Sequence, residues 1–305
     1  MRVATALPSA TEIVYALGVE PVAVSHECVY PPAAADRPRL NSCVVDPEGS
    51  SEDINEQLEA HDQVYEVDRD TLREVDPDIV ITQAVCDVCA VDEILIRDAV
   101  EEMDLDCEVL TTDSHSLDDV LDEVLRIGEA IDRETEAREL VEDCRDRISQ
   151  VESRAAEAVA ENGRPRCIVT DWMEPPMVAG HWTPEMVELA GGEYGITEPE
   201  AYSVPEDWAD IVDFDPETLI VSPCGFSIEH TLRDVDELRT RDDWSDLTAV
   251  QNSDLYAMDG DVLNCSSPRL VDALEHLAGL LHPDYFERPP EDAYAEVPVR
   301  PTPEA

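Results

Sequence analysis

The sequence contains no lysine, and all 20 of its basic residues are arginine. Its 73 acidic residues leave a formal net charge of −53. A surface of this sign repels the phosphates of nucleic acids and of anionic lipids, so both are excluded as partners. Hydrophobic residues still make up 43% of the chain, which argues against wholesale disorder. The composition is typical of a folded protein from a high-salt interior, where a Debye length of about 3 Å at 1 M screens like charges.

Long apolar runs are absent as well. No run approaches the roughly 20 residues of a membrane-spanning helix, so we expect no membrane span. Met1 and Arg2 lead directly into a short strand pattern rather than into a signal peptide. We therefore expect a cytoplasmic protein, and an extracytoplasmic one only if the true start lies upstream. The nine cysteines are an odd number and are scattered, which suits reduced thiols better than a disulfide framework.

Alternating strand and helix patterns predict an α/β fold for the first part of the chain. Ser9 and Glu12 have the spacing of a capping box, which predicts that a helix begins there and runs to Gly18. The other helical patterns cover residues 91–103 and 117–131. Strand patterns cover residues 3–7, 22–24, 79–82 and 108–110.

Residues 134–162 contain neither glycine nor proline and end at Asn162-Gly163, a plausible helix stop. A helix over these 29 positions is about 43 Å long at 1.5 Å per residue, long enough to join two lobes. Strand patterns then return at 166–170, 219–222 and 254–258, with helices at 183–190, capped by Thr183, and 268–281. We expect a lobe over 1–132, a linking helix over 133–163, a second lobe over 164–283 and a mobile acidic, proline-rich tail over 284–305.

Four short segments place thiols and imidazoles in loops: Ser25-His26-Glu27-Cys28, Cys86-Asp87-Val88-Cys89, Gly180-His181-Trp182 and Pro223-Cys224-Gly225-Phe226. Three of them follow predicted strands, and open α/β sheets bind ligands beyond the carboxyl ends of their strands. The sequence therefore predicts a ligand site in these loops. His181 precedes a predicted helix, whose dipole favours a neutral imidazole able to contact a ligand.

The spacing of the cysteines is compatible with a metal site. Two residues separate Cys86 from Cys89, the spacing that lets both sulfurs reach one metal or form a redox pair. Together with Cys28, Cys224 and either His26 or His181, they predict a tetrahedral site as one alternative. A redox role is a second alternative, and simple packing of small apolar side chains is a third. No nucleophile elbow, P-loop or metalloprotease helix is present, so we expect no enzymatic activity.

Seven motifs then occur in the order seen in one known family. They are Pro8-Ser9-Ala10-Thr11-Glu12, Gly18-Val19 with Pro21-Val22, Ser25 through Pro32, Asp76-Pro77-Asp78-Ile79-Val80, Glu174-Pro175-Pro176 with Ala179-Gly180, Glu188-Leu189-Ala190-Gly191-Gly192, and Ser267-Pro268-Arg269. The chain resembles a halophilic archaeal version of the cobalamin-binding substrate-binding proteins of ABC transporters, of the class III clamshell type. The resemblance implies two Rossmann-like lobes with largely parallel sheets, joined by one long α-helix, and a corrinoid in the cleft between them.

The resemblance also implies which residues contact the ligand. From the resemblance come Tyr30, Met177, Trp208 and Arg269. The thiol- and imidazole-bearing loops add His181, Trp182 and Cys224 to the predicted set, and coordination of corrinoid cobalt becomes a further alternative role for the loop cysteines. Arg269 suits a phosphate or an amide oxygen of a cobalamin because its guanidinium donates two hydrogen bonds in parallel. An ABC permease is the implied partner; Asp70 matches one acidic docking position, whereas the other is Ala209. The alternative function is a cytoplasmic metal or redox protein that holds Zn, Fe or an Fe-S cluster with its cysteines.

Overall fold

The computed structural model describes residues 1–61, 63–84 and 93–299. These residues form two compact units. Unit 1 comprises Met1–Asp46, Asn55–Cys144 and Ser266–Pro268; unit 2 comprises Pro47–Ile54, Arg145–Cys265 and the described residues from Arg269 on. Each unit therefore includes a short segment whose neighbours in sequence belong to the other unit.

Unit 1 is built on a parallel sheet with the strand order β2-β1-β5-β6. The strands are β1 (Val3–Thr5), β2 (Ala23–Val24), β5 (Ile79–Gln83) and β6 (Glu108–Thr112). β1 is shorter than expected because a helix begins directly after it. All four strands lie where the sequence predicted strands, which confirms the α/β class for this unit.

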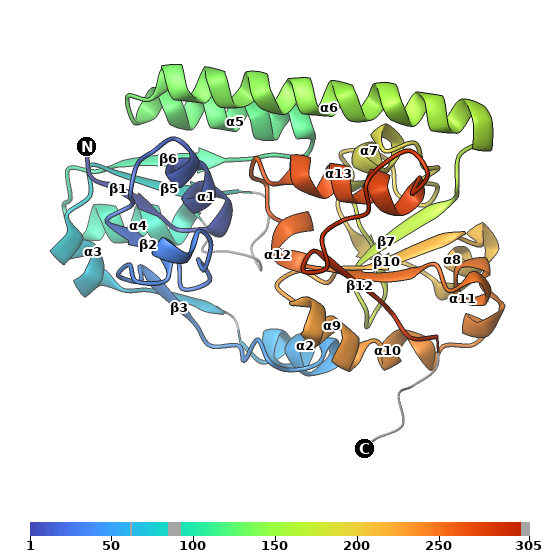
Figure 1. Ribbon diagram of the computed structural model, residues 1–305. Helices are drawn as coiled ribbons and strands as arrows, with labels where there is room; N and C mark the ends of the chain where they lie inside the picture. The colour runs from blue at the N-terminus through green and yellow to red at the C-terminus, as the bar shows by residue number, and fades with distance from the viewer. Residues whose placement is uncertain (62, 85–92, 300–305) are drawn as a thin grey trace. The chain divides into compact units, whose positions relative to one another are not determined.

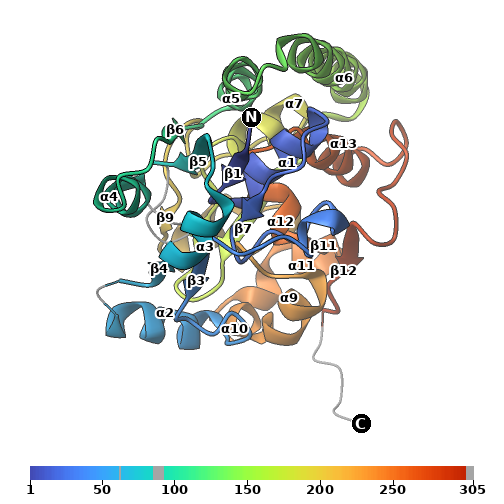
Figure 2. The same ribbon diagram turned by 90° about the vertical axis from the view of Figure 1, so that its left-hand side faces the viewer.

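Helices cover both faces of this sheet (Figure 2). They are α1 (Pro8–Ala16), α3 (Arg69–Val75), α4 (Glu93–Glu102) and α5 (Leu117–Ala130). Ala4 and Val80 belong to a buried cluster with Leu72 of α3 and Ile96 of α4. Thr5, the next residue of β1, contacts Thr11 of α1 instead. Alternate side chains of the strand thus face opposite helical layers, as the pleat requires.

The start of α1 differs from the prediction. The helix begins at Pro8, with Leu7 at the N-cap position and no capping side chain. Ser9 and Glu12 are both 6% exposed and lie inside the helix, so the predicted capping box is wrong. Proline at the first turn supplies a helical φ and has no amide hydrogen to satisfy, which makes a side-chain cap unnecessary.

Unit 1 also contains a hairpin that the sequence patterns did not indicate. β3 (Asn41–Cys43) and β4 (Tyr65–Val67) pair antiparallel, with Asn41 opposite Val67. The connection between them contains α2 (Ser51–Ala60). Three-residue strands carry too little periodicity to be recognised from sequence alone.

Unit 2 contains a six-stranded sheet with the order β12-β11-β10-β7-β8-β9. β7, β10 and β11 are parallel, and the outer pairings are antiparallel. The bounds are β7 (Cys167–Trp172), β8 (Met177–Val178), β9 (Val204–Pro205), β10 (Thr218–Val221), β11 (Leu255–Met258) and β12 (Tyr294–Glu296). The three parallel strands are those that the sequence predicted.

Helices flank the parallel strands of unit 2 on both sides (Figure 1). The bounds are α7 (Thr183–Leu189), α8 (Trp208–Phe214), α9 (Ile228–Asp234), α10 (Asp236–Arg239), α11 (Thr248–Asn252), α12 (Gly260–Leu263) and α13 (Leu270–Leu281). α7 packs against α13, whereas α9 contacts β11. Thr183 is the first residue of α7 rather than its cap, so that prediction is wrong.

The segment after α13 is folded. β12 pairs with β11, placing Ala295 opposite Ala257, and Val297 is only 3% exposed. The guanidinium carbon of Arg154 lies 5.4 Å from the centre of the Phe286 ring. The predicted mobile tail is therefore wrong for residues 284–299, because β12 satisfies the hydrogen bonds of an otherwise open sheet edge.

The long helix α6 (Glu134–Asn162) has the bounds that the sequence predicted. It ends before Gly163, whose φ of 83° stops the helix. Its buried residues follow helical spacing along one stripe: Ala137, Val141, Cys144, Val151, Ala155 and Ala158. None of the helices in the described part of the chain is both long enough and apolar enough to cross a membrane.

Candidate functional site

In unit 1, the loop after β2 holds a buried thiol. Cys28 is 0% exposed, and its sulfur lies 3.0 Å from the hydroxyl oxygen of Thr11. Burial raises the pKa of this thiol to about 12. A thiolate is the form that binds metal or attacks an electrophile, so this neutral, packed thiol is poorly suited to either role.

His26, in the same loop, is oriented by Asn41. The Asn41 amide nitrogen lies 2.9 Å from Nδ1 of His26, and its amide oxygen accepts from the His26 backbone N–H at 3.2 Å. In this arrangement Nδ1 accepts and Nε2 carries the proton. Burial lowers the pKa of His26, which favours the neutral ring. The neutral imidazole therefore has its N–H donor at the carboxyl end of β2, with Nε2 3.7 Å from Oε1 of Glu27.

Tyr30 lies at the exposed end of this loop. It is 47% exposed and its neighbour Val29 is 57% exposed. Arg39 holds the preceding backbone by donating to the carbonyls of Ser25 at 2.8 Å and Cys28 at 2.9 Å. The predicted contact residue Tyr30 is thus accessible, on a loop tied down by an arginine.

In unit 2, Trp208 belongs to an aromatic and charged group. Its ring stacks on Trp244 with centroids 6.1 Å apart, and the guanidinium of Arg241 lies 5.6 Å from its centre. Arg241 also bonds the Glu174 carboxylate, just before the cis peptide bond to Pro175. The sequence indicated Trp208 and the Glu174-Pro175-Pro176 turn separately; the fold brings them together through Arg241, which no motif had indicated.

The turn containing His181 is built by close backbone packing. A side chain at Gly180 would place its Cβ 2.2 Å from the carbonyl oxygen of Ala201, so only glycine fits. The Gly180 N–H donates to the Ser203 hydroxyl at 2.9 Å. His181 has a φ of 51°, and its ring lies edge-on to Tyr202 with centroids 5.2 Å apart. Tyr202 is 56% exposed, so the His181–Tyr202 pair reaches the surface.

Other predicted ligand residues of unit 2 differ in accessibility. Met177 of β8 and Cys224 are half-buried. Trp182 is 6% exposed and its indole N–H donates to the carbonyl of Leu263 at 2.8 Å, which is typical of a core residue. Arg269 is half-buried at the N-cap position of α13. Burial and the charge of Asp259 raise the pKa of the Asp261 carboxyl, and the positive charge of Arg269 partly offsets this rise.

The loop after β10 packs on the end of β7. The backbone N–H of Cys224 donates to the carbonyl of Asp171 at 3.1 Å. Phe226 is 2% exposed and meets the ring of Trp172 edge-on, with centroids 5.5 Å apart. This contact forms an aromatic wall at the carboxyl ends of two parallel strands, where open α/β sheets bind ligands.

The metal alternative gains no support from the described residues. Residues 1–61, 63–84 and 93–299 contain no group of three or more His, Cys, Asp or Glu side chains arranged to hold a metal ion. Cys28 belongs to unit 1 and Cys224 to unit 2. Cys86 and Cys89 lie outside the described residues.

The expected permease-docking positions are exposed in their own units. The Asp70 side chain is 98% exposed and pairs with Arg73 at 3.0 Å. Ala209 is exposed in α8, next to Asp207, which caps that helix. Asp70 is therefore an exposed acidic side chain of unit 1, and its docking role stays a prediction.

Comparison with known proteins identifies the family. A family model described as periplasmic binding protein matches residues 3–262. A vitamin B12-binding protein from Vibrio cholerae is 24% identical over 287 residues, which cover 92% of this chain and 88% of that protein. YvrC of Bacillus subtilis, an uncharacterized ABC transporter substrate-binding lipoprotein, is 24% identical over 195 residues, which cover 62% of this chain and 59% of YvrC.

Solved structures agree on the fold. A periplasmic heme-binding protein from Pseudomonas aeruginosa matches with a TM-score of 0.74 at 17% identity, covering 99% of both chains. These relatives are named for binding rather than for catalysis, in keeping with the expectation of a non-enzymatic protein. The matched family model spans most of both units, and the chain belongs to the periplasmic binding protein family.

Proposed function

We propose that this protein binds a corrinoid, cobalamin or a close relative, either as the substrate-binding component of an ABC transporter or as an intracellular corrinoid-binding relative of such components. One observation carries the proposal: the relative named for vitamin B12 aligns along 92% of the chain. The ligand contacts are the loops at the carboxyl ends of the parallel strands in each unit.

The side chains in and near these loops, together with Trp208 of α8 and Arg269 at the N-cap of α13, suit a large, flat macrocycle with polar edges. Tyr30 of unit 1 and Trp172 and Trp208 of unit 2 offer ring faces and edges for apolar contact. His26 offers a neutral N–H, and Arg269 offers a guanidinium for amide or phosphate oxygens. The absence of lysine leaves arginine as the only strong cation for anionic groups of the ligand.

Haem is the second candidate ligand. It is favoured by the structural match to the heme-binding protein from Pseudomonas aeruginosa. Both ligands are tetrapyrrole-like rings that need an aromatic, mostly apolar site, so ring contact alone does not separate them. The polar groups at the edge of the ring distinguish the two ligands, since a corrinoid carries neutral amides whereas haem carries two carboxylates.

Titration in molar KCl tests the proposal. We expect cyanocobalamin to quench tryptophan fluorescence with a Kd below about 100 µM, which is about −5.5 kcal/mol. Tyr30→Ala should raise this Kd about tenfold, or about 1.4 kcal/mol. Tyr285→Ala is the matched control, because Tyr285 bonds Glu161 away from the strand-end loops. Binding of haemin without binding of cyanocobalamin would replace the corrinoid by haem, and binding of neither would refute the proposal.

The permease partner and the cellular location form a separate proposal. Asp70 is the docking residue that we propose in unit 1. Fractionation of cells with an antibody against the protein tests the expected cytoplasmic location, which corresponds to an intracellular corrinoid-binding role. Recovery of the protein outside the cytoplasm, on a membrane that holds the permease, supports transport instead.

A further inference from the structure

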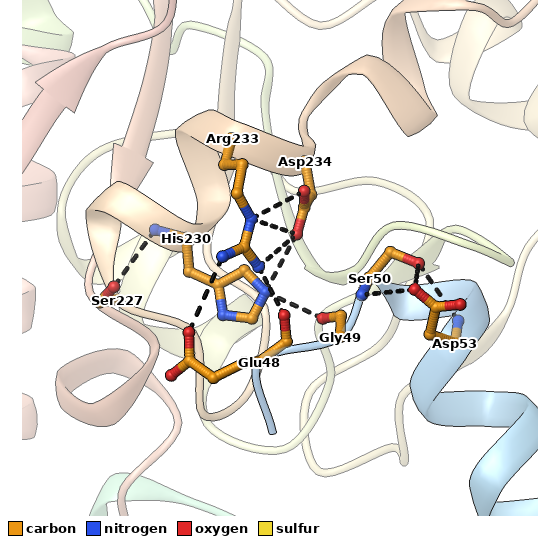
Figure 3. A network of polar contacts seen from close by, with 8 residues as sticks. All are labelled: Glu48, Gly49, Ser50, Asp53, Ser227, His230, Arg233 and Asp234. Atoms are coloured by element: carbon orange, nitrogen blue, oxygen red, sulfur yellow. Dashed lines mark hydrogen bonds and ion pairs between the residues drawn. The ribbon is translucent and has the colours of Figure 1, made fainter. Parts of the chain in front are cut away.

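The segment Pro47–Ile54 is docked on unit 2 although the residues on both sides of it belong to unit 1. Figure 3 shows the contacts, which come from α9. Ser50 and Asp53 bond each other at the start of α2, with the Asp53 N–H donating to the Ser50 hydroxyl at 3.2 Å. Ser51 is 0% exposed. The segment therefore enters unit 2 with a defined backbone conformation.

His230 is the central residue of this contact. Its Nε2 lies 3.0 Å from the carbonyl oxygen of Gly49 and 3.0 Å from Oδ2 of Asp234 (Figure 3). Both partners are acceptors, so the proton of the ring is on Nε2. The side chain is 7% exposed, and a buried donor of this kind is costly to lose because the acceptors that remain are desolvated.

Arg233 binds the neighbouring peptide group. Its Nη2 donates to the carbonyl of Glu48 at 2.8 Å, and the same guanidinium donates to Asp234 at 2.9 Å. Two consecutive carbonyls of the segment, those of Glu48 and Gly49, are thus held by one turn of α9. Asp234 orients both donors.

His230 also contacts the strand-end loop after β10. The imidazole stacks on Phe226 with centroids 3.6 Å apart and planes 12° apart. Phe226 in turn meets Trp172 edge-on. A continuous chain of contacts therefore runs from Gly49 through His230 and Phe226 to Trp172, the aromatic wall described above.

We infer that His230 is a positioning residue of the ligand site in unit 2. Its N–H docks the segment Pro47–Ile54, and its ring sets the orientation of Phe226 and, through it, of Trp172. A change at His230 should therefore alter both the docking of the segment and the affinity for the ligand. His230 is buried and acts through Phe226 rather than by contact with the ligand. This inference rests on the proposed function for its ligand and on the described contacts for its mechanism.

Two substitutions separate the two roles of His230. His230→Phe keeps an aromatic ring against Phe226 but removes the donor, whereas His230→Gln keeps an N–H donor but removes the ring. His282→Gln is the matched control, because His282 is also a buried histidine of unit 2 that bonds a backbone carbonyl, that of Gly191 at 3.2 Å. Arg233→Gln is a milder variant, since the Arg233 side chain is 48% exposed and lies outside the ring stack.

Amide hydrogen exchange and cyanocobalamin titration are the readouts, with circular dichroism confirming that each variant is folded. In His230→Phe, the rate of amide hydrogen exchange in residues 47–54 should rise about tenfold, because the donor to Gly49 is lost. In His230→Gln, exchange in residues 47–54 should stay near the wild-type rate, whereas exchange in residues 222–226 should rise because the ring stack on Phe226 is lost. Arg233→Gln should raise exchange in 47–54 by a smaller factor. Both His230 variants should raise the Kd for cyanocobalamin about three- to tenfold, and His282→Gln should leave this Kd and the exchange in residues 47–54 and 222–226 unchanged.

The outcomes distinguish this inference from the proposed function. The inference is overturned if a folded His230→Phe protein exchanges its amide hydrogens in residues 47–54 at the wild-type rate. If His230→Phe does not fold, the same result in Arg233→Gln overturns it. So does a Kd within twofold of wild type in all of these variants. If the wild-type protein binds no cyanocobalamin, the proposed corrinoid function fails, while the exchange results still decide whether His230 docks the segment and supports the strand-end loop.

Discussion

The hydroxyl of Ser267 donates a buried hydrogen bond to the carboxylate of Glu12, a residue 255 positions earlier in the sequence. Both residues lie in unit 1, to which Ser266–Pro268 contributes a short segment. Ser267 is 0% exposed and Glu12 is 6% exposed. Two motifs of the family resemblance, Pro8 to Glu12 and Ser267 to Arg269, thus include a pair of residues that support the structure of unit 1.

Replacement of Ser267 by alanine should destabilise unit 1. The Glu12 carboxylate would lose a donor inside the protein, which costs about 1–3 kcal/mol. Urea unfolding in molar KCl measures the loss. Ser266→Ala is the neighbouring control and should change the free energy of unfolding by less than about 0.5 kcal/mol. Equal effects of the two substitutions would show that the bond to Glu12 contributes nothing measurable.

Cys28 and Cys167 should resist alkylation in the folded protein. Burial raises the pKa of each thiol to about 12, against an ordinary value of 9.0. At pH 8 the thiolate fraction is then lower by about 1,000-fold, before any loss of access to the reagent is counted. Peptide mapping after iodoacetamide treatment should find both unmodified, and both modified once the protein is unfolded in urea. Rapid labelling of native Cys28 would contradict the buried position and would reopen its role as a metal ligand.

His282 should make stability depend on pH. It is 4% exposed, lies 3.2 Å from the carbonyl oxygen of Gly191, and burial lowers its pKa. The unfolded chain takes up a proton near pH 6.5 that the folded state binds only at lower pH. Stability from the neutral ring is therefore present above about pH 6.5 and is lost as the pH falls through the lowered value.

Unfolding experiments at pH 7 and pH 5 check this prediction. His282→Gln should lose less stability than wild type between the two values, because glutamine does not titrate. The exposed His61 provides the control, and His61→Gln should follow wild type. A pH dependence of His282→Gln as steep as that of wild type would show that other groups account for the loss.

Low salt should loosen the fold. Lowering ionic strength lengthens the Debye length from about 3 Å at 1 M to about 10 Å at 0.1 M, so more pairs among the 73 acidic residues repel each other. We expect ligand binding to fail at a higher KCl concentration than secondary structure does. Circular dichroism and ligand titration between about 0.05 and 3 M KCl measure both. Full folding and binding at the lowest concentration would show that the acidity is not an adaptation to salt.

Much of the architecture is encoded locally. α6 has its predicted bounds because residues 134–162 lack helix breakers and Gly163 ends the run. The parallel strands β5, β7, β10 and β11 were recognised as short apolar runs, since both faces of each are covered by helices. Tyr30 lies in a loop, as the resemblance implied, and its exposure of 47% is a finding of the structure.

Other features exist only because distant segments meet. β12 is stable as a strand because β11 offers an open edge, and the Pro47–Ile54 segment lies in unit 2 because α9 binds its carbonyls. Arg241 joins Trp208 to Glu174 although no motif contains it.

Sequence by itself determined the α/β class, the long helix and the family, since helix propensity, apolar periodicity and motif order are properties of neighbouring residues. Only the tertiary structure decided that Ser9 and Glu12 are buried rather than capping, that Cys28 is a neutral thiol, and that His230 connects Gly49 to Phe226. Burial, pKa and long-range hydrogen bonds depend on which surfaces pack together, and that is a property of the whole chain.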